Sequence, residues 1–148
     1  MVILTTTFCR CCMCYTPKRA LEDVLSTGNM TLYPDSCAQA TASFSVLSET
    51  IKFIQEFFAG KMKKKDLSAL LKNLQELEKE KLHLTAAYHL ERIRQRNQEQ
   101  LPEELSDPRI ENLLAEGVAS MKQKIGVCIQ DINEILDEVR MTMLEDDV

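Results

Sequence analysis

The feature that most constrains the fold is a long heptad pattern in the last third of the chain. Apolar residues recur there at alternating spacings of four and three positions. They are Leu114, Val118, Met121, Ile125, Cys128, Ile132, Ile135 and Val139. This spacing places every member on one stripe of an α-helix, which we call its seam. The chain must bury this stripe against another helix.

Two upstream segments carry similar seams. The helix expected from Asp35 to Gly60 has Phe44, Leu47, Ile51, Ile54 and Phe58. The helix expected from Asp66 to about residue 100 has Leu67, Leu70, Leu74, Leu77, Leu84 and Tyr88, widened by Leu71 and Leu82. The short connections between these helices predict antiparallel neighbours.

The ends of these helices are marked by capping residues. We expect Asp35 or Ser36 to cap the first helix and Asp66 to cap the second. Asp107 is expected to cap the last helix, because Pro108 suits its first position. Within the second helix, Glu76–Glu80 are expected on the solvent side. Lys81 is the one polar seam position, and either its charge reaches water or it sets the register.

The sequence therefore predicts an all-α protein, an elongated antiparallel three-helix bundle or coiled coil. A short extra N-terminal helix is expected from Arg19 to about Ser26. The predicted helical domain spans residues 18–145, and an acidic tail follows at 146–148. No apolar run approaches the ~18 residues that a transmembrane helix needs, so no such segment is predicted.

Residues 1–17 differ from the rest and are expected to form an unstructured, cysteine-rich tail. They lack the basic start, long apolar stretch and cleavage site of a signal peptide, so secretion is disfavoured and reduced thiols are expected. The tail holds the one dense cluster of ligand residues, Cys9, Cys11, Cys12 and Cys14. Four thiols within six residues converge poorly on one metal. The cluster is therefore only a weak metal candidate, and acylation or no role at all are the alternatives.

The charge is unevenly distributed along the chain. The net charge is -5, with an excess of basic residues in 60–100 and of acidic residues in 101–148. Pairing between a basic and an acidic helix explains this pattern most simply. A phosphate-binding face or a tail for a basic partner is the alternative. The two basic stretches, at residues 61–65 and 92–96, lie at opposite ends of one helix, which disfavours direct nucleic-acid binding.

The chain offers few residues for catalysis. His83 and His89 are six positions apart, whereas a helical metal pair needs a spacing of four. The sequence contains no Gly-rich phosphate loop, no nucleophile elbow and no zinc-protease motif. A bundle with an interior of Leu, Ile, Phe and Val provides no pocket of convergent polar groups. We therefore expect neither an enzyme nor a cofactor.

The last two helices are longer than the first, so part of their seams is expected to lack a partner within the chain. Such an exposed seam predicts contact with another protein's helix or with a second copy. The candidate partner-binding residues lie around the connection between these two helices. They are Tyr88, Leu90, Ile93, Leu101, Leu105, Ile110, Leu113 and Leu114.

Four stretches resemble one known family in their order and spacing. They are Val24–Gly28 with Phe44–Glu49, the central run from Leu70 to Ala86, and the closing run from Met121 to Arg140. Over about residues 20–145 the chain is similar to the "required for excision 1-B" domain family. Residues 1–17 depart from that family's longer first helix. The resemblance implies a helical accessory protein of DNA excision repair, without an enzymatic activity or catalytic residues to carry over.

Two functions follow as hypotheses. The first is a non-enzymatic accessory protein of excision repair that acts through helix–helix contacts. The second is a coiled-coil scaffold subunit of a cytoskeletal, ciliary or trafficking complex with no repair role. The expected location is nuclear, cytoplasmic or both.

Overall fold

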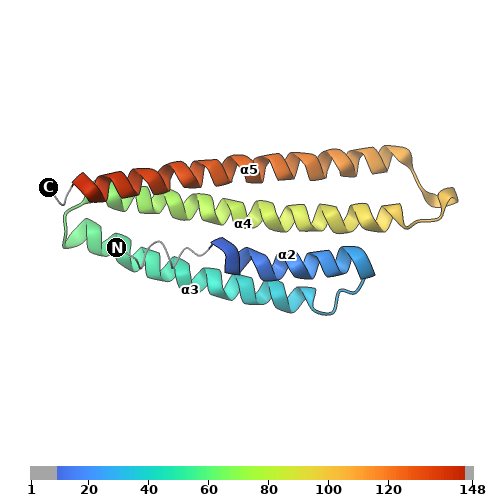
Figure 1. Cartoon of the computed structure of the whole chain (residues 1–148), viewed down its shortest axis with the longest axis horizontal. Helices are drawn as coiled ribbons and strands as arrows, with labels where there is room; N and C mark the ends of the chain where they lie inside the picture. Colours follow the sequence, from blue (N-terminus) through green and yellow to red (C-terminus); the bar gives the residue numbers. More distant parts are fainter. Residues whose placement is uncertain (1–9, 146–148) are drawn as a thin grey trace. The chain divides into compact units, whose positions relative to one another are not determined.

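The computed structural model describes the backbone of residues 10–145 and the side chains of residues 17–144. Its elements are α2 (Arg10–Thr27), α3 (Tyr33–Gly60), α4 (Lys65–Glu99), the 3-10 helix η1 (Glu103–Leu105) and α5 (Pro108–Glu145) (Figure 1). Residues 10–145 contain no strand, which confirms the all-α prediction for this part of the chain. None of the helices in this part has both the length and the apolar character needed to cross a membrane.

The chain divides into two compact units, Met1–Thr50 and Ile51–Val148, with the boundary inside α3. The first unit holds α2 and residues 33–50 of α3, and the second holds residues 51–60 of α3 and the rest of the chain. The three-helix bundle and the single domain of residues 18–145 stay predictions.

In the first unit, α2 begins earlier than the sequence analysis expected. The helix starts at Arg10 and includes Pro17, whereas residues 10–17 were expected in an unstructured tail. A proline inside a helix lacks the N–H that would bond to the preceding turn, which is why Pro17 suggested a boundary. The helix accommodates this loss and buries Ala20, Leu21 and Val24 on one face.

A tight polar turn joins α2 to α3. Gly28 adopts a positive φ of 78°, and its N–H donates to the carbonyl of Val24 at 2.8 Å. This is the left-handed helix ending that glycine makes easily. The Asn29 side chain then accepts a hydrogen bond from the N–H of Thr31 at 2.9 Å. The helix that was expected to end at about Ser26 ends at Thr27.

The predicted cap of α3 is wrong by a few residues. The helix begins at Tyr33, so Asp35 lies inside its first turn instead of capping it. The Ser36 N–H already donates to the Leu32 carbonyl at 3.1 Å. Pro34 fits this earlier start, because a first-turn residue has no intrahelical N–H bond to lose.

The connection from α3 to α4 also differs from the prediction. The N–H groups of Lys61 and Met62 both donate to the carbonyl of Phe57, at 3.0 and 3.2 Å. The residue at the cap position of α4 is Lys64, without a side-chain capping bond, so Asp66 is not the cap. Asp66 lies in the first turn instead, where its charge still complements the helix dipole.

In the second unit, α4 and α5 pack side by side in opposite directions (Figure 1). The core contains Leu67, Leu71 and Leu74 of α4 with Cys128, Ile132 and Val139 of α5. All eight members of the seam predicted for α5 are buried or half-buried. The heptad pattern therefore identified the inward face of α5 correctly.

Candidate functional site

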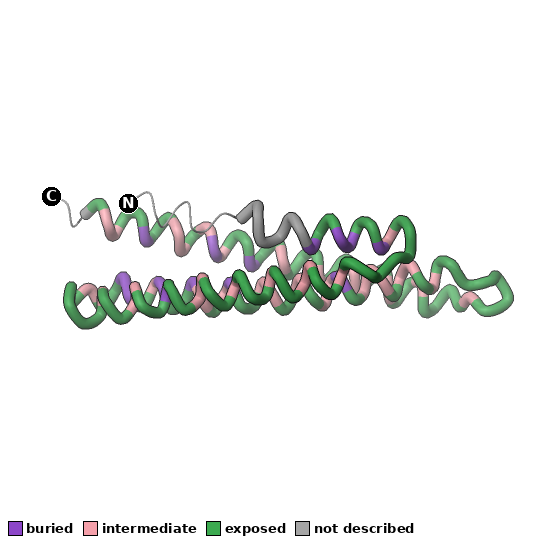
Figure 2. Tube along the Cα trace, turned by 90° about the horizontal axis from the view of Figure 1, so that it is seen from below, coloured by how far each residue is buried: buried purple, intermediate pink, exposed green. Residues whose placement is uncertain are grey.

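The candidate site is the far end of the α4–α5 pair, residues 90–127, which we call the tip. No residue between 90 and 127 is buried, whereas buried residues occur on both sides of this range, at His89 and Cys128 (Figure 2). The apolar seam nevertheless continues through the tip. Its members there reach only half-burial: Ile93, Leu114, Val118, Met121 and Ile125. The tip therefore has apolar stripes without a closed core.

Backbone and polar contacts hold the turn at the tip. The Pro102 carbonyl accepts hydrogen bonds from the N–H groups of Leu105 and Ser106, at 2.8 and 3.1 Å. Asp107 Oδ1 accepts the Arg109 N–H at 2.9 Å, which confirms Asp107 as the cap of α5. The Ser106 hydroxyl donates to the Glu111 carboxylate. These contacts use backbone and polar side-chain groups and not the leucine side chains.

The structure places the predicted partner-binding residues in two groups. Five are exposed: Leu90, Leu101, Leu105, Ile110 and Leu113. Three are half-buried: Tyr88, Ile93 and Leu114. Leu105 and Leu113 are the most open, with exposed fractions of 68% and 67%. Whether these residues bind a partner stays a prediction, but the first group has the exposure that docking requires.

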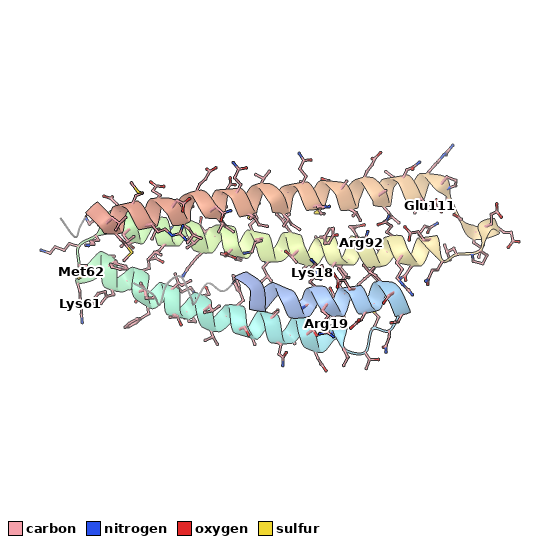
Figure 3. All side chains as sticks on the ribbon, viewed as in Figure 1. Lys18, Arg19, Lys61, Met62, Arg92 and Glu111 are labelled. Atoms are coloured by element: carbon pink, nitrogen blue, oxygen red, sulfur yellow. The ribbon has the colours of Figure 1, made fainter. Side chains whose placement is uncertain are left out.

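The charged groups at the end of the tip, in residues 99–111, are mainly acidic. Residues 99–111 contain Glu99, Glu103, Glu104, Asp107, Glu111 and a single basic residue, Arg109. On α4, Arg94 forms an ion pair with Glu91 at 2.9 Å, and most of the Arg94 side chain is exposed. Arg92 is half-buried and donates to Gln95 at 3.4 Å (Figure 3). Arg92 and Arg94 both belong to the basic stretch at residues 92–96, but Arg92 is half-buried and Arg94 is exposed.

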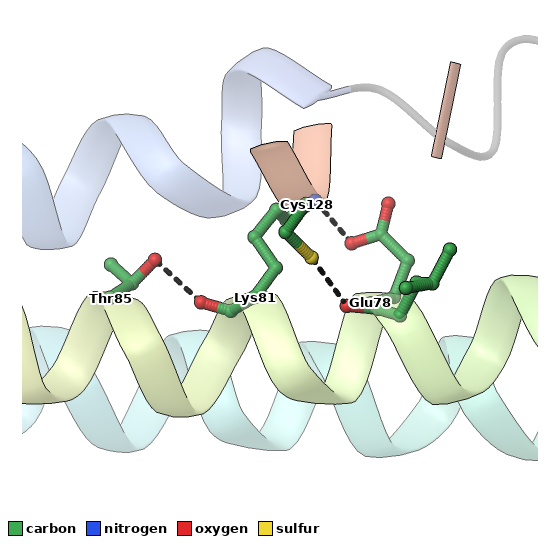
Figure 4. Close-up of polar contacts among 5 residues, drawn as sticks. Glu78, Lys81, Thr85 and Cys128 are labelled. Carbon is green, nitrogen blue, oxygen red and sulfur yellow. Dashed lines mark hydrogen bonds and ion pairs between the residues drawn. The ribbon is translucent and has the colours of Figure 1, made fainter. Parts of the chain in front are cut away.

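Sequence reasoning missed a buried polar group in the middle of α4. Glu78 was expected on the solvent side, but only 7% of it is exposed, and its carboxylate forms an ion pair with Lys81 (Figure 4). The pair is spaced i,i+3, which puts both side chains on one face of the helix. The i,i+3 spacing of Glu78 and Lys81 makes them a candidate ion pair in the sequence. A comparison of i,i+4 positions alone does not find this pair. Lys81 therefore occupies its seam position with its charge paired to the Glu78 carboxylate.

Cys128 lies beside this ion pair and is a core residue, as the seam predicted. Its thiol donates to the Leu77 carbonyl, with an Sγ–O distance of 3.3 Å. Burial raises the pKa of the Cys128 thiol, and the negative charge of Glu80 raises the pKa further. A raised pKa keeps the thiol protonated, which disfavours nucleophilic or metal-binding chemistry.

The two histidines do not form a site together. His83 is exposed and His89 is buried. Burial lowers the pKa of His89, and its ring lies 6.1 Å from that of Tyr88, centre to centre.

Among the residues whose side chains are described, no three His, Cys, Asp or Glu groups come together as metal ligands. Cys9 and the side chains of Cys11, Cys12 and Cys14 lie outside the described part. The metal and acylation hypotheses for them stay untested.

The fold and the tip define a class of protein: an all-α chain whose last two helices form an antiparallel pair with an open apolar end. The chain belongs to the DNA repair REX1-B family, whose sequence pattern matches residues 8–92. This membership confirms the resemblance inferred from the sequence. No curated protein and no solved structure matches the chain significantly.

The limits of the family match differ from those expected. The match begins at residue 8, within the segment expected to depart from the family, and it ends in α4 at Arg92. It therefore covers α2 and α3 but does not include α5 or most of the tip. The association with DNA repair rests on residues 8–92. The choice of the tip as the candidate site rests on its exposed apolar residues.

Proposed function

We propose that this protein is a non-enzymatic accessory factor of DNA excision repair that binds a helix of a larger repair protein on its tip. One observation carries the choice of surface: residues 90–127 hold the first half of the α5 seam and a group of exposed apolar residues, but no buried residue. Membership in the DNA repair REX1-B family supports the repair role. The proposal places the protein in the nucleus, where excision repair acts on DNA.

Helix packing explains what a partner gains at the tip. An amphipathic helix laid along the pair covers the exposed leucines and completes the burial of half-buried residues such as Ile93 and Leu114. Apolar area removed from water stabilises a complex by roughly 25 cal/mol per Å². This gain is largest where the free surface is most open, at Leu105 and Leu113.

The charge of the tip indicates the kind of helix it accepts. Acidic residues surround the exposed leucines, among them Glu99, Glu103 and Glu104. Complementary charge around an apolar centre raises the association rate and selects partners. We therefore propose a partner helix with a basic rim. The same charges repel the phosphates of DNA, so the proposal assigns DNA contact to the partner.

The test is proximity labelling in cells with three forms of the full chain. The tip variant carries Leu105→Glu and Leu113→Glu, two exposed positions whose change leaves the packed core intact. The control variant carries Met141→Glu and Leu144→Glu, which are exposed apolar positions at the other end of α5. All three forms have to give the same circular dichroism spectrum.

We expect nuclear excision-repair proteins to be labelled by the wild type and the control, and to be lost with the tip variant. Equal labelling by the tip variant would show that the surface is wrong. Labelling of cytoskeletal, ciliary or trafficking proteins in place of repair proteins would support the scaffold function instead.

A further inference from the structure

We propose that a second copy of this chain also binds the tip, through the connection between α3 and α4. We call this connection, residues 61–65, the basic turn. The proposal shares the tip surface with the proposed function but does not depend on a repair role. Both surfaces lie in the unit formed by residues 51–148.

The basic turn combines positive charge with exposed apolar groups. Four of its five residues are lysines, and the fifth, Met62, is exposed (Figure 3). The last turns of α3 add Phe53, with an exposed fraction of 71%, and the exposed Phe57. Lys61 Nζ lies 5.7 Å from the centre of the Phe57 ring. Exposed aromatic rings beside lysines are typical of a surface that another molecule covers.

The tip has the complementary character. Residues 99–111 carry five acidic groups and one basic group, and Leu101 and Leu105 are exposed among them. Each surface thus offers apolar side chains within a field of one sign, and the two signs are opposite. Such juxtaposed patches attract each other and fix the orientation of a complex.

The two surfaces do not meet within one chain. They lie at opposite ends of α4, which has 35 residues (Figure 1). At 1.5 Å per residue this helix is about 52 Å long. Charges interact over a Debye length of only about 8–10 Å at ordinary ionic strength. Their complementarity can therefore act only between two copies.

Neighbouring acidic groups reduce the charge of the basic turn only in part. Asp66 follows it directly in the sequence, and the seven residues from Gly60 to Asp66 keep an excess of positive charge. On the C-terminal turns of α5, the Asp137 carboxylate is already paired with Arg140. The basic turn thus keeps a net positive charge within its own sequence.

Binding of one end to the other end of a second copy is a heterologous contact, which continues into a chain or closes into a ring. It also covers the tip. Self-association and the binding of a repair partner therefore compete, and a partner at high concentration disperses the assembly.

The experiment is sedimentation velocity of the full chain with a reducing agent, so that the six cysteines form no bridges. At about 25 mM salt we expect the average mass to rise with protein concentration above the 16.9 kDa of one chain. At about 500 mM salt we expect a monomer, because screening removes the attraction. A monomer at low salt over about a hundredfold range of concentration overturns the proposal.

Charge exchange identifies the surfaces. The turn variant carries Lys61→Glu and Lys65→Glu, and the tip-charge variant carries Glu103→Lys and Glu104→Lys; all four positions are exposed. Each variant alone is expected to self-associate at least about tenfold more weakly. Mixed in equal amounts, they are expected to associate again, because the unchanged acidic tip of the turn variant faces the unchanged basic turn of the tip-charge variant.

The matched control is Lys72→Glu with Lys79→Glu, two exposed positions on α4 outside the tip and the basic turn, with the same change in net charge as the turn variant. It is expected to associate like the wild type. Association that survives both surface variants, or a mixture that fails to associate, overturns the proposal. The turn variant leaves the tip intact, so it keeps the repair labelling expected above, and the two proposals can fail independently.

Discussion

Ile132 is almost fully buried in the core between α4 and α5, while Leu113 on the same helix is mostly exposed. We expect Ile132→Ala to lower the free energy of unfolding by about 2–5 kcal/mol, through lost burial and the cavity left behind. Leu113→Ala is the matched control and should change it by less than about 0.5 kcal/mol. Urea denaturation measures both. Similar losses in the two variants would mean that the core does not lie where the structure places it.

The Glu78–Lys81 ion pair makes a different prediction, because each charge is mostly buried. Lys81→Met leaves the Glu78 carboxylate without its partner and should cost about 3–5 kcal/mol of unfolding free energy. The double variant Glu78→Leu with Lys81→Met removes both charges and should recover most of that loss. Denaturation of the single and double variants gives the coupling. Additive effects would contradict a direct interaction.

His89 should make stability depend on pH. Its lowered pKa means that the native state takes up a proton less readily than the unfolded chain. As the pH falls through the unfolded value of about 6.5, the unfolded chain gains a proton first, and stability falls by at most about 1.4 kcal/mol per pH unit.

We expect His89→Gln to remove the loss of stability that this histidine causes as the pH falls from 7 into the acid range. The control His83→Gln should retain that loss. Thermal unfolding at several pH values makes the comparison. If the wild type and His89→Gln show the same pH dependence, the burial of this ring is not what governs it.

At the scale of elements, the turn at the tip depends on the cap of α5. Asp107→Ala removes the bond from Asp107 Oδ1 to the Arg109 N–H and should cost about 1 kcal/mol. Asp107→Asn keeps an accepting oxygen and should recover most of the loss. The melting temperatures of the three proteins are the measurement. An equal loss in both variants would attribute the effect to charge and not to capping.

The sequence predicted the helices well because their signals are local. Gly28 ends α2 in a left-handed conformation, Pro108 opens α5, and the alternating spacing identified the inward face of α5. Two boundaries were predicted wrongly. The α2 helix continues through Pro17. The α4 helix begins without Asp66 as its cap, and the Ser68 N–H donates to the carbonyl of Lys64 there.

The candidate site was predictable only in part. The residues around the connection between α4 and α5 stood out because the seams of these helices were expected to extend beyond the helix that covers them. Spacing separates part of this set: Leu114 belongs to the seam and is half-buried, whereas its neighbour Leu113 lies off the seam and is exposed. Leu105 lies in η1, where helical spacing makes no prediction of its exposure. It also missed the burial of Glu78, which depends on how the helices pack and not on the charge itself.

In the molecule as a whole, residues 8–92 match the family, whereas most of the tip lies outside this range. The family match ends at Arg92, near the start of the tip. The packed parts of α4 and α5 hold the tip in place, and the tip itself keeps its apolar residues open. Substitutions of the exposed tip residues are therefore expected to leave the pair folded.

The central claim is that the tip is an open surface in the free protein, and hydrogen exchange tests it most directly. In the isolated chain, the amides of residues 90–98 and 109–127 should exchange faster than those of residues 67–89 and 128–142, because local opening is easiest where few side chains are buried. Monomeric protein at high salt is used, so that self-association does not protect the tip. Equal protection in both regions would mean that the tip has a closed core, and the account of this surface would be wrong.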